Sequence, residues 1–222
     1  CLSTRALTGI TLYRPAELII SARAGTPLAE IEAALAEKGQ QIIAEPPYFN
    51  ALFGTTAAPS LGGVIATNLS GPRRIAWGAM RDHLLGIRFV NGDGEVIRSG
   101  GRVLKNVTGL DLCKLLAGSY GTLGVLTEVT LKILPAPETS ATLLLQTPDL
   151  TAAVKALSSG LGSPFSVTGA AAFHQGTATL AALRLEDFAP SVAYRMAKLR
   201  EALAQFGDCL LYTSDAADDT PC

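Results

Sequence analysis

The sequence predicts an α+β protein in which a larger first domain precedes a smaller second one, on three observations. A strand, a helix and a second strand follow one another between residues 17 and 44. A glycine-rich turn leads directly into a long alternating strand that begins at Val125. Finally, Pro135-Ala136-Pro137 breaks the pattern, and a new series of strands and helices begins beyond it. The order of strands and helices therefore favours two small α+β cores.

The first domain is predicted to open with a strand over residues 17–22. Thr26 is placed to cap a helix whose first position is Pro27. One face of that helix is apolar, with Leu28, Ile31 and Leu35, and Gly39 marks its end. Residues 41–44 then read as a short returning strand. A strand, helix and strand in this order fit one small α/β lobe.

A glycine pair, Gly62-Gly63, follows a candidate helix cap, Ser60, within the stretch 59–72. Glycines leave a backbone open to close approach, and amide N–H groups at such a turn can bind an anion such as a nucleotide pyrophosphate. The alternative is that the pair only serves a turn between core elements. Both interpretations remain open from this stretch alone.

A second glycine-rich run covers residues 118–128, and an alternating strand rather than a helix follows it. The Rossmann fingerprint and the ATP-binding phosphate loop are both absent from the chain. Between the two runs, residues 84–90 and 95–98 are predicted to pair as a hairpin through the turn 91–94. Residues 110–117 are predicted to form a short helix that leads into the second run, with Asp111 as its cap.

The second domain has the predicted order strand, helix, strand, strand, helix. Its strands are expected at 141–146, 165–172 and 177–185, and its helices at 150–157 and 191–206. This order is that of a ferredoxin-like unit without its final strand. Residues 209–222 are polar and patternless where that strand was expected. We interpret them as a non-native tail outside the fold.

Composition excludes several classes of function. Hydrophobic residues make up 48% of the 222 residues and the net charge is −1, as in an ordinary globular protein. The chain has no broad basic face of the kind that binds nucleic acid. It also has no run of about 18 apolar residues that could span a membrane. The four cysteines have no metal-binding spacing, so we expect no metal site, a cytoplasmic location and a buried, unreactive Cys113.

The two glycine runs together resemble the FAD-binding module of the vanillyl-alcohol oxidase/PCMH flavoprotein superfamily. Further blocks in order narrow the resemblance to the FAD-binding subunits of bacterial glycolate oxidases. These blocks are residues 22–28, 45–47, 70–74, 81–82 and 105–109. The resemblance covers about residues 1–140. It implies a PCMH-type FAD-binding domain over 1–135 that lacks its N-terminal part, an incomplete ferredoxin-like cap domain over 138–208, and the tail over 209–222.

The resemblance also implies FAD as cofactor and names residues that would contact it. Ser60, Leu61, Gly62, Gly63, Ala66 and Thr67 would line the pyrophosphate and the ribityl chain, while Gly71 and Gly78 would keep the backbone close. Gly121, Gly124 and Val125 would lie by the adenosine half, with the Val125 backbone at the adenine. In the resembled family a segment N-terminal to this region supplies a further wall, so we expect one wall of the site to be missing.

The implied function is that of a glycolate oxidase complex, which oxidises glycolate to glyoxylate. The implied partners are a paralogous FAD-linked subunit and an iron–sulfur subunit, with any membrane association peripheral and through the complex. Two alternatives stay open: a scaffold subunit that no longer holds flavin, and a stand-alone FAD-linked dehydrogenase for D-lactate or a related acid.

Oxidation of a 2-hydroxy acid needs a base for the hydroxyl proton and a cation for the carboxylate. No base and cation for these two roles can be identified together in the sequence, so no catalytic residue is assigned. His83 lacks the neighbours of a base, and His174 is expected in a turn. Arg81-Asp82 is interpreted as a salt bridge and cap at a strand entry, and Lys105 as an exposed lysine.

Overall fold

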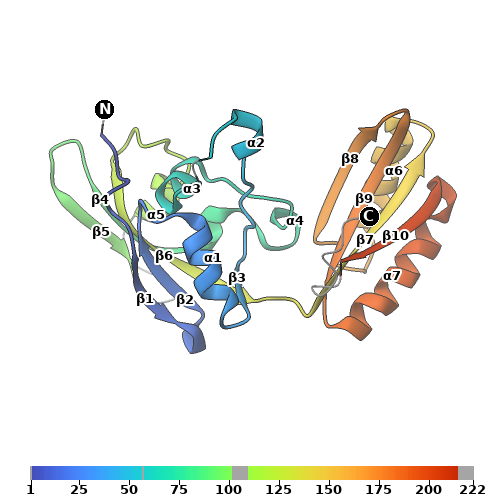
Figure 1. Cartoon of the computed structure of the whole chain (residues 1–222), viewed down its shortest axis with the longest axis horizontal. Coiled ribbons are helices and arrows are strands. Elements are labelled where there is room, and N and C mark those ends of the chain that lie inside the picture. The colour runs from blue at the N-terminus through green and yellow to red at the C-terminus, as the bar shows by residue number, and fades with distance from the viewer. Residues whose placement is uncertain (1, 57, 102–109, 215–222) are drawn as a thin grey trace. The chain divides into compact units, whose positions relative to one another are not determined.

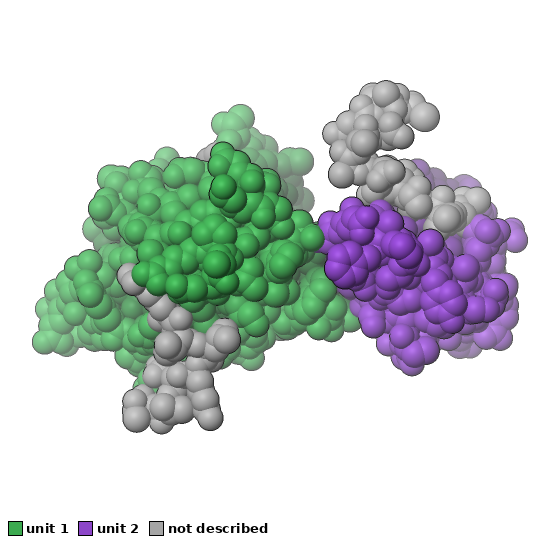
Figure 2. All heavy atoms as spheres, turned by 90° about the horizontal axis from the view of Figure 1, so that it is seen from below, with its two compact units in different colours: residues 1–136 green, residues 137–222 purple. Residues whose placement is uncertain are grey.

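The computed structural model describes residues 2–56, 58–101 and 110–214, and within residues 210–214 only the backbone. The chain divides into two compact units, residues 1–136 and 137–222 (Figure 2). Each unit has its own hydrophobic core.

The first unit is built on a sheet of antiparallel strands in the order β1-β2-β6-β4-β5, and β3 also pairs with β6 (Figure 1). Its long central strand is β6, the predicted alternating strand that follows the second glycine run. The strands are β1 (Ile10–Arg14), β2 (Ile19–Arg23), β3 (Gln40–Ile42), β4 (Leu84–Val90), β5 (Val96–Gly100) and β6 (Val125–Pro135).

The helices α1 (Leu28–Ala36), α3 (Leu61–Thr67) and α5 (Leu112–Leu116) pack on the sheet of the first unit, and their apolar side chains share one core with alternate residues of β2, β4 and β6. The predicted apolar face of α1, with Leu28, Ile31 and Leu35, is fully buried. Further short helices are α2 (Asn50–Phe53) and α4 (Arg74–Trp77), with 3₁₀ turns η1 (Pro15–Glu17) and η2 (Met80–His83).

Local signals in the first unit are largely confirmed. Gly39 ends α1 with a φ of 61°. In the hairpin turn, the Asn91 Oδ1 accepts from the backbone N–H groups of Asp93 and Glu95 at 3.0 and 2.9 Å. Asp111 caps α5 by accepting from the Lys114 N–H at 3.2 Å. The prediction that Thr26 caps α1 is wrong, because the N-cap position is occupied by Pro27. The Thr26 hydroxyl instead accepts a hydrogen bond from the Gly9 backbone N–H at 3.0 Å.

The second unit has a four-stranded antiparallel sheet in the order β10-β7-β9-β8. Its helices pack on the sheet through a core of leucines, alanines and Met196. The elements are β7 (Thr139–Thr147), α6 (Leu150–Leu161), β8 (Gly169–Gln175), β9 (Ala178–Asp187), α7 (Ala189–Leu203), η3 (Ala204–Phe206) and β10 (Asp208–Ser214). The order and the sheet are those of the ferredoxin-like unit that the sequence predicts.

Two expectations for this unit need correction. The final strand is present, because Asp208–Ser214 forms β10 and pairs along the free edge of β7 from Gln146 to Ser140. Residues 209–214 therefore belong to the fold, and their first four residues, Cys209 to Tyr212, are apolar rather than polar as the interpretation of the whole tail assumed. The rest of the predicted tail, 215–222, lies outside the described residues. The other correction is that β8 begins at Gly169 rather than at 165, because Ser166 has a φ of 54° and the chain joins β9 only from Thr168 onward.

Candidate functional site: a pocket between two glycine runs

The first glycine run forms the start of helix α3, where Ser60 is the N-cap as predicted. The Ser60 side-chain oxygen accepts from the Gly63 N–H at 3.3 Å. The two preceding amides are used by the neighbouring segment, since Leu61 N donates to Thr26 O at 2.9 Å and Gly62 N to Ala24 O at 2.7 Å. The Leu61 and Gly62 amides are therefore not free to bind an anion. These amides anchor the helix instead.

The two adjacent glycines of this run have different surroundings. A Cβ on Gly62 would lie 2.7 Å from the Ala24 Cβ and 2.9 Å from the Ala24 oxygen, so Gly62 is required by packing. A Cβ on Gly63 would meet only the Ser60 Oγ, at 3.2 Å, and Gly63 is exposed. The fold thus demands a glycine at the first position. At the second it leaves a surface open to a ligand.

The second glycine run is tied to the end of the same helix by two backbone hydrogen bonds. Gly118 N donates to Ile65 O at 3.2 Å, and Tyr120 N donates to Ala66 O at 2.8 Å. Gly121 has a φ of 75°, and a Cβ there would have no neighbour within 4 Å, whereas a Cβ on Gly124 would lie 2.7 Å from the Phe89 ring. This run therefore also combines a packing glycine with an open one.

A pocket of about 370 Å³ lies where the two runs meet. It contains seven of the sequence-predicted residues: Ser60, Gly62, Gly63, Ala66, Gly121, Gly124 and Val125. The sequence reasoning did not single out the remaining lining residues, which are Leu2, Thr4, Ala24, Ser119 and Leu126. Ala24, Ser119 and Leu126 fall inside blocks that carried the family resemblance, so position within a block was the available signal.

Four predicted residues do not line this pocket. Leu61 is buried in the core, and the Thr67 hydroxyl donates within α3 to Gly63 O at 2.8 Å. Gly71 packs on the Glu45 carbonyl, which a Cβ would overlap, and Gly78 has a φ of 88° beside Asp82. These residues support the helix and the following loop.

The loop after α3 is held by side chains on both sides. Asn68, at the C-cap of α3 with a φ of 51°, accepts from Arg81 N at 2.9 Å, and Ser70 Oγ accepts from Met80 N at 2.8 Å. Asp82 accepts from Ala79 N at 2.8 Å and pairs with Lys114 Nζ at 3.2 Å. The predicted cap and salt bridge are thus confirmed for Asp82, with Lys114 as the cation.

These contacts shift the pKa of the Asp82 carboxyl. Partial burial opposes its ionisation, but the Ala79 hydrogen bond and the Lys114 ammonium outweigh it and hold the pKa below the ordinary value of 3.8. Lys105, from the separate family block 105–109, lies outside the described residues.

The remaining titratable candidates do not reach the pocket. His83 is 8% exposed, its Nε2 has no hydrogen-bond partner among the described residues, and burial lowers its pKa below 6.5. His174 lies within β8 rather than in a turn, and its Nδ1 is 3.2 Å from the Thr179 hydroxyl. Cys113 is buried as predicted, and burial raises the pKa of its thiol.

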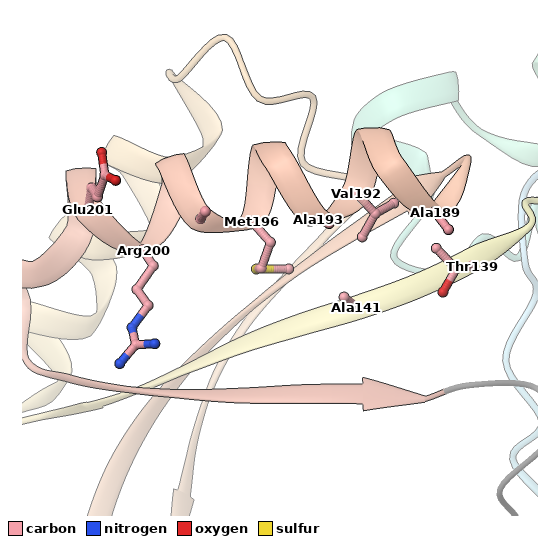
Figure 3. Close-up of a pocket in the computed structure, with 9 residues that line it drawn as sticks. Thr139, Ala141, Ala189, Val192, Ala193, Met196, Arg200 and Glu201 are labelled. Atoms are coloured by element: carbon pink, nitrogen blue, oxygen red, sulfur yellow. The ribbon is translucent and has the colours of Figure 1, made fainter.

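The second unit has a larger hollow of about 500 Å³ between α7 and β7 (Figure 3). Its walls are mainly alanines with Val192 and Met196, and Arg200 and Glu201 stand at one end. It contains none of the predicted site residues. In the part of the chain that the structure describes, no helix is long and apolar enough to cross a membrane.

The first unit is similar to known FAD-binding domains. Residues 1–100 match the family model described as FAD binding domain. The chain is 49% identical over 142 residues to the glycolate oxidase subunit GlcE of Escherichia coli (strain K12), covering 64% of this chain and 39% of that protein.

Other relatives are named as a further glycolate oxidase subunit and a D-lactate dehydrogenase. The chain is 41% identical to glycolate oxidase subunit GlcD of Bacillus subtilis (strain 168), over 45% of this chain and 21% of that protein. It is 38% identical to a D-lactate dehydrogenase of Archaeoglobus fulgidus, over 50% of this chain and 24% of that protein. The chain therefore spans less than two fifths of the length of each of these relatives.

A solved structure of alkyldihydroxyacetonephosphate synthase superposes with a TM-score of 0.74, covering 94% of this chain and 42% of that one at 19% identity. This likeness supports the fold of the chain.

Proposed function

We propose that this chain is the FAD-binding subunit of a glycolate oxidase complex, which oxidises glycolate to glyoxylate and passes electrons through flavin to an iron–sulfur subunit. The observation that carries the proposal is the pocket in which both glycine runs meet. The 49% identity to a glycolate oxidase subunit supports the choice of complex. A paralogous FAD-linked subunit is the expected partner.

The pocket fits the approach of a dinucleotide. Gly63 and Gly121 are not crowded by the fold, so their missing side chains leave room for a ligand backbone to come close. In this proposal Ser60, Gly63 and Ala66 lie along the pyrophosphate and ribityl chain, with Thr67 on the same helix. Gly121, Gly124 and Val125 lie along the adenosine half.

The other predicted residues support the pocket without lining its ligand-facing surface. Leu61 and Gly62 fix α3 against the core, and Gly71 and Gly78 shape the loop that follows. Because the first amides of α3 are already bonded, hydroxyl groups such as those of Ser60 and Ser119 are among the donors that the pocket offers a ligand. The chain therefore supplies shape and a few hydroxyls rather than a cluster of charge.

Bound FAD would supply the two-electron acceptor that oxidation of a 2-hydroxy acid requires. The same oxidation releases two protons, and one must leave the hydroxyl through a base. Neither histidine lines the pocket, and its lining residues include no cation for the substrate carboxylate. We therefore assign the acid-binding chemistry to the complex, with this chain as an accessory flavin subunit.

The test is dye reduction with glycolate or D-lactate as electron donor. We expect the isolated chain to be inactive, and the complex of this chain with the paralogous flavin subunit and the iron–sulfur subunit to be active. Omission of this chain should abolish that activity. Robust turnover by the isolated chain would instead support a stand-alone dehydrogenase, as the similarity to D-lactate dehydrogenases allows. A chain that is required but binds no FAD would be a scaffold.

A further inference from the structure

Charged side chains form a row across four strands of the first unit. The strand register pairs Arg23 of β2 with Glu128 of β6, and Glu128 with Arg88 of β4. Arg88 is in turn paired with Arg98 of β5. Residues directly opposite each other in antiparallel strands lie on the same face, with Cβ atoms about 4.5–5.5 Å apart. The four charges therefore follow one another as plus, minus, plus, plus.

The row lies on the face of the sheet that turns away from the core. Ile87 and Phe89, which flank Arg88 along β4, are both buried in the core cluster, and successive strand residues point to opposite faces. Arg23 and Arg98 are exposed, and Arg88 and Glu128 are half-buried. The charges are therefore accessible to a partner.

Glu128 is the single acidic residue of the row, and it stands opposite both Arg23 and Arg88 in the strand register. Within the described ranges, none of the guanidinium groups of the three arginines takes part in a hydrogen bond or an ion pair. Glu128 is held by the Thr11 hydroxyl, which donates to its Oε1 at 2.8 Å. Like charges directly opposite each other, as at Arg88 and Arg98, destabilise a sheet. Among the described residues, no ion pair to Arg88 or Arg98 offsets this repulsion.

A hollow of about 330 Å³ opens within the row. Arg23, Arg88 and Glu128 line it, together with Thr127 and three apolar side chains, Leu7, Val90 and Val96. Two guanidinium groups beside an apolar rim suit an inserted carboxylate side chain, because guanidinium and carboxylate can pair through two parallel hydrogen bonds.

We propose that this row docks an acidic surface of a partner protein, and that the partner is another subunit of the flavoprotein complex. The inference rests on the proposed function for the identity of the partner. The pattern of charges favours a protein over a lipid or nucleic acid surface. A protein can place a cation opposite Glu128 and carboxylates opposite the arginines, whereas a surface of uniform phosphates would set a negative charge against Glu128.

The experiment titrates purified partner subunits, singly and together, into this chain with FAD present, and measures the dissociation constant at two salt concentrations. Arg98→Glu is the test variant, and Lys38→Glu, an exposed lysine outside the row, is the matched control with the same change of charge. We expect Arg98→Glu to weaken association about tenfold or more and to reduce its salt dependence, and Lys38→Glu to leave both unchanged. Equal affinity of the two variants would overturn the proposal.

Glu128→Gln distinguishes the kinds of partner by the sign of its effect. If the partner is a protein that supplies a cation opposite Glu128, the substitution weakens association. If the partner is uniformly anionic, the substitution strengthens association. Tighter binding of Glu128→Gln to phosphatidylserine vesicles or to duplex DNA would overturn the protein partner. A wild-type chain that binds FAD but none of the subunits would overturn the docking proposal and leave the cofactor assignment intact. A wild-type chain that binds no FAD would instead refute the proposed function.

Discussion

The backbone N–H of Gly62 donates to the Ala24 carbonyl at 2.7 Å, and at this contact the two backbones are too close for a side chain between them. The contact joins the first turn of α3 to the end of β2. It thereby sets the position of the neighbouring Gly63, which is open to the pocket.

We predict that Gly62→Ala destabilises the first unit by about 1–3 kcal/mol, since the added Cβ would overlap the Ala24 backbone and force a shift. Urea unfolding followed by circular dichroism measures the loss. Gly92→Ala is the control, because a Cβ at Gly92 has no neighbour within 4 Å. Equal stability of the two variants would contradict the packing role of Gly62.

Gly63→Val is predicted to abolish FAD binding while the fold persists. The branched side chain would occupy the open surface of α3, where in our proposal the pyrophosphate passes, and its Cβ would crowd only the Ser60 Oγ. Flavin fluorescence titration measures binding, and thermal unfolding checks the fold. A variant that binds FAD as tightly as the wild type would show that the pocket assignment is wrong.

Asp82 is predicted to make folding sensitive to acid. Its pKa is lower in the folded chain than the ordinary 3.8, so its contribution to stability is present above about pH 4 and is lost as the pH falls through the lower folded value. Asp82→Asn should therefore be less stable than the wild type at pH 6, and the difference should shrink toward pH 2–3. The melting temperature across this range tests it, with Asp93→Asn in an exposed turn as control.

His83 is predicted to make folding stability depend on pH over a higher range than Asp82 does. Burial lowers its folded pKa below 6.5, so the folded chain favours the neutral ring and loses stability as the pH falls from about 6.5 toward the folded value. His83→Phe should flatten this part of the stability profile, whereas His174→Gln should retain the wild-type slope. An unchanged slope in His83→Phe would assign the acid sensitivity to other groups.

Local sequence signals predicted those elements whose geometry depends on near neighbours. Ser60 caps α3, Asp111 caps α5 and Gly39 ends α1, because each uses only groups within a few residues. Thr26 failed as a cap because a distant segment, at Gly9, offered its hydroxyl a partner. Strand β10 was missed for a similar reason, since its pairing with β7 is a long-range contact, and the polar residues that follow it obscured its short apolar segment.

The sequence by itself determined the two glycine runs, their order and the family blocks around them, and these were sufficient to predict a PCMH-type FAD-binding domain. Only the tertiary structure decided which glycine serves which purpose. Gly62 and Gly63 are adjacent and chemically identical, yet one lies against Ala24 and the other faces the pocket. The physical reason is that the space beside a glycine is defined by segments distant in the chain, here the end of β2 and the turn before β6.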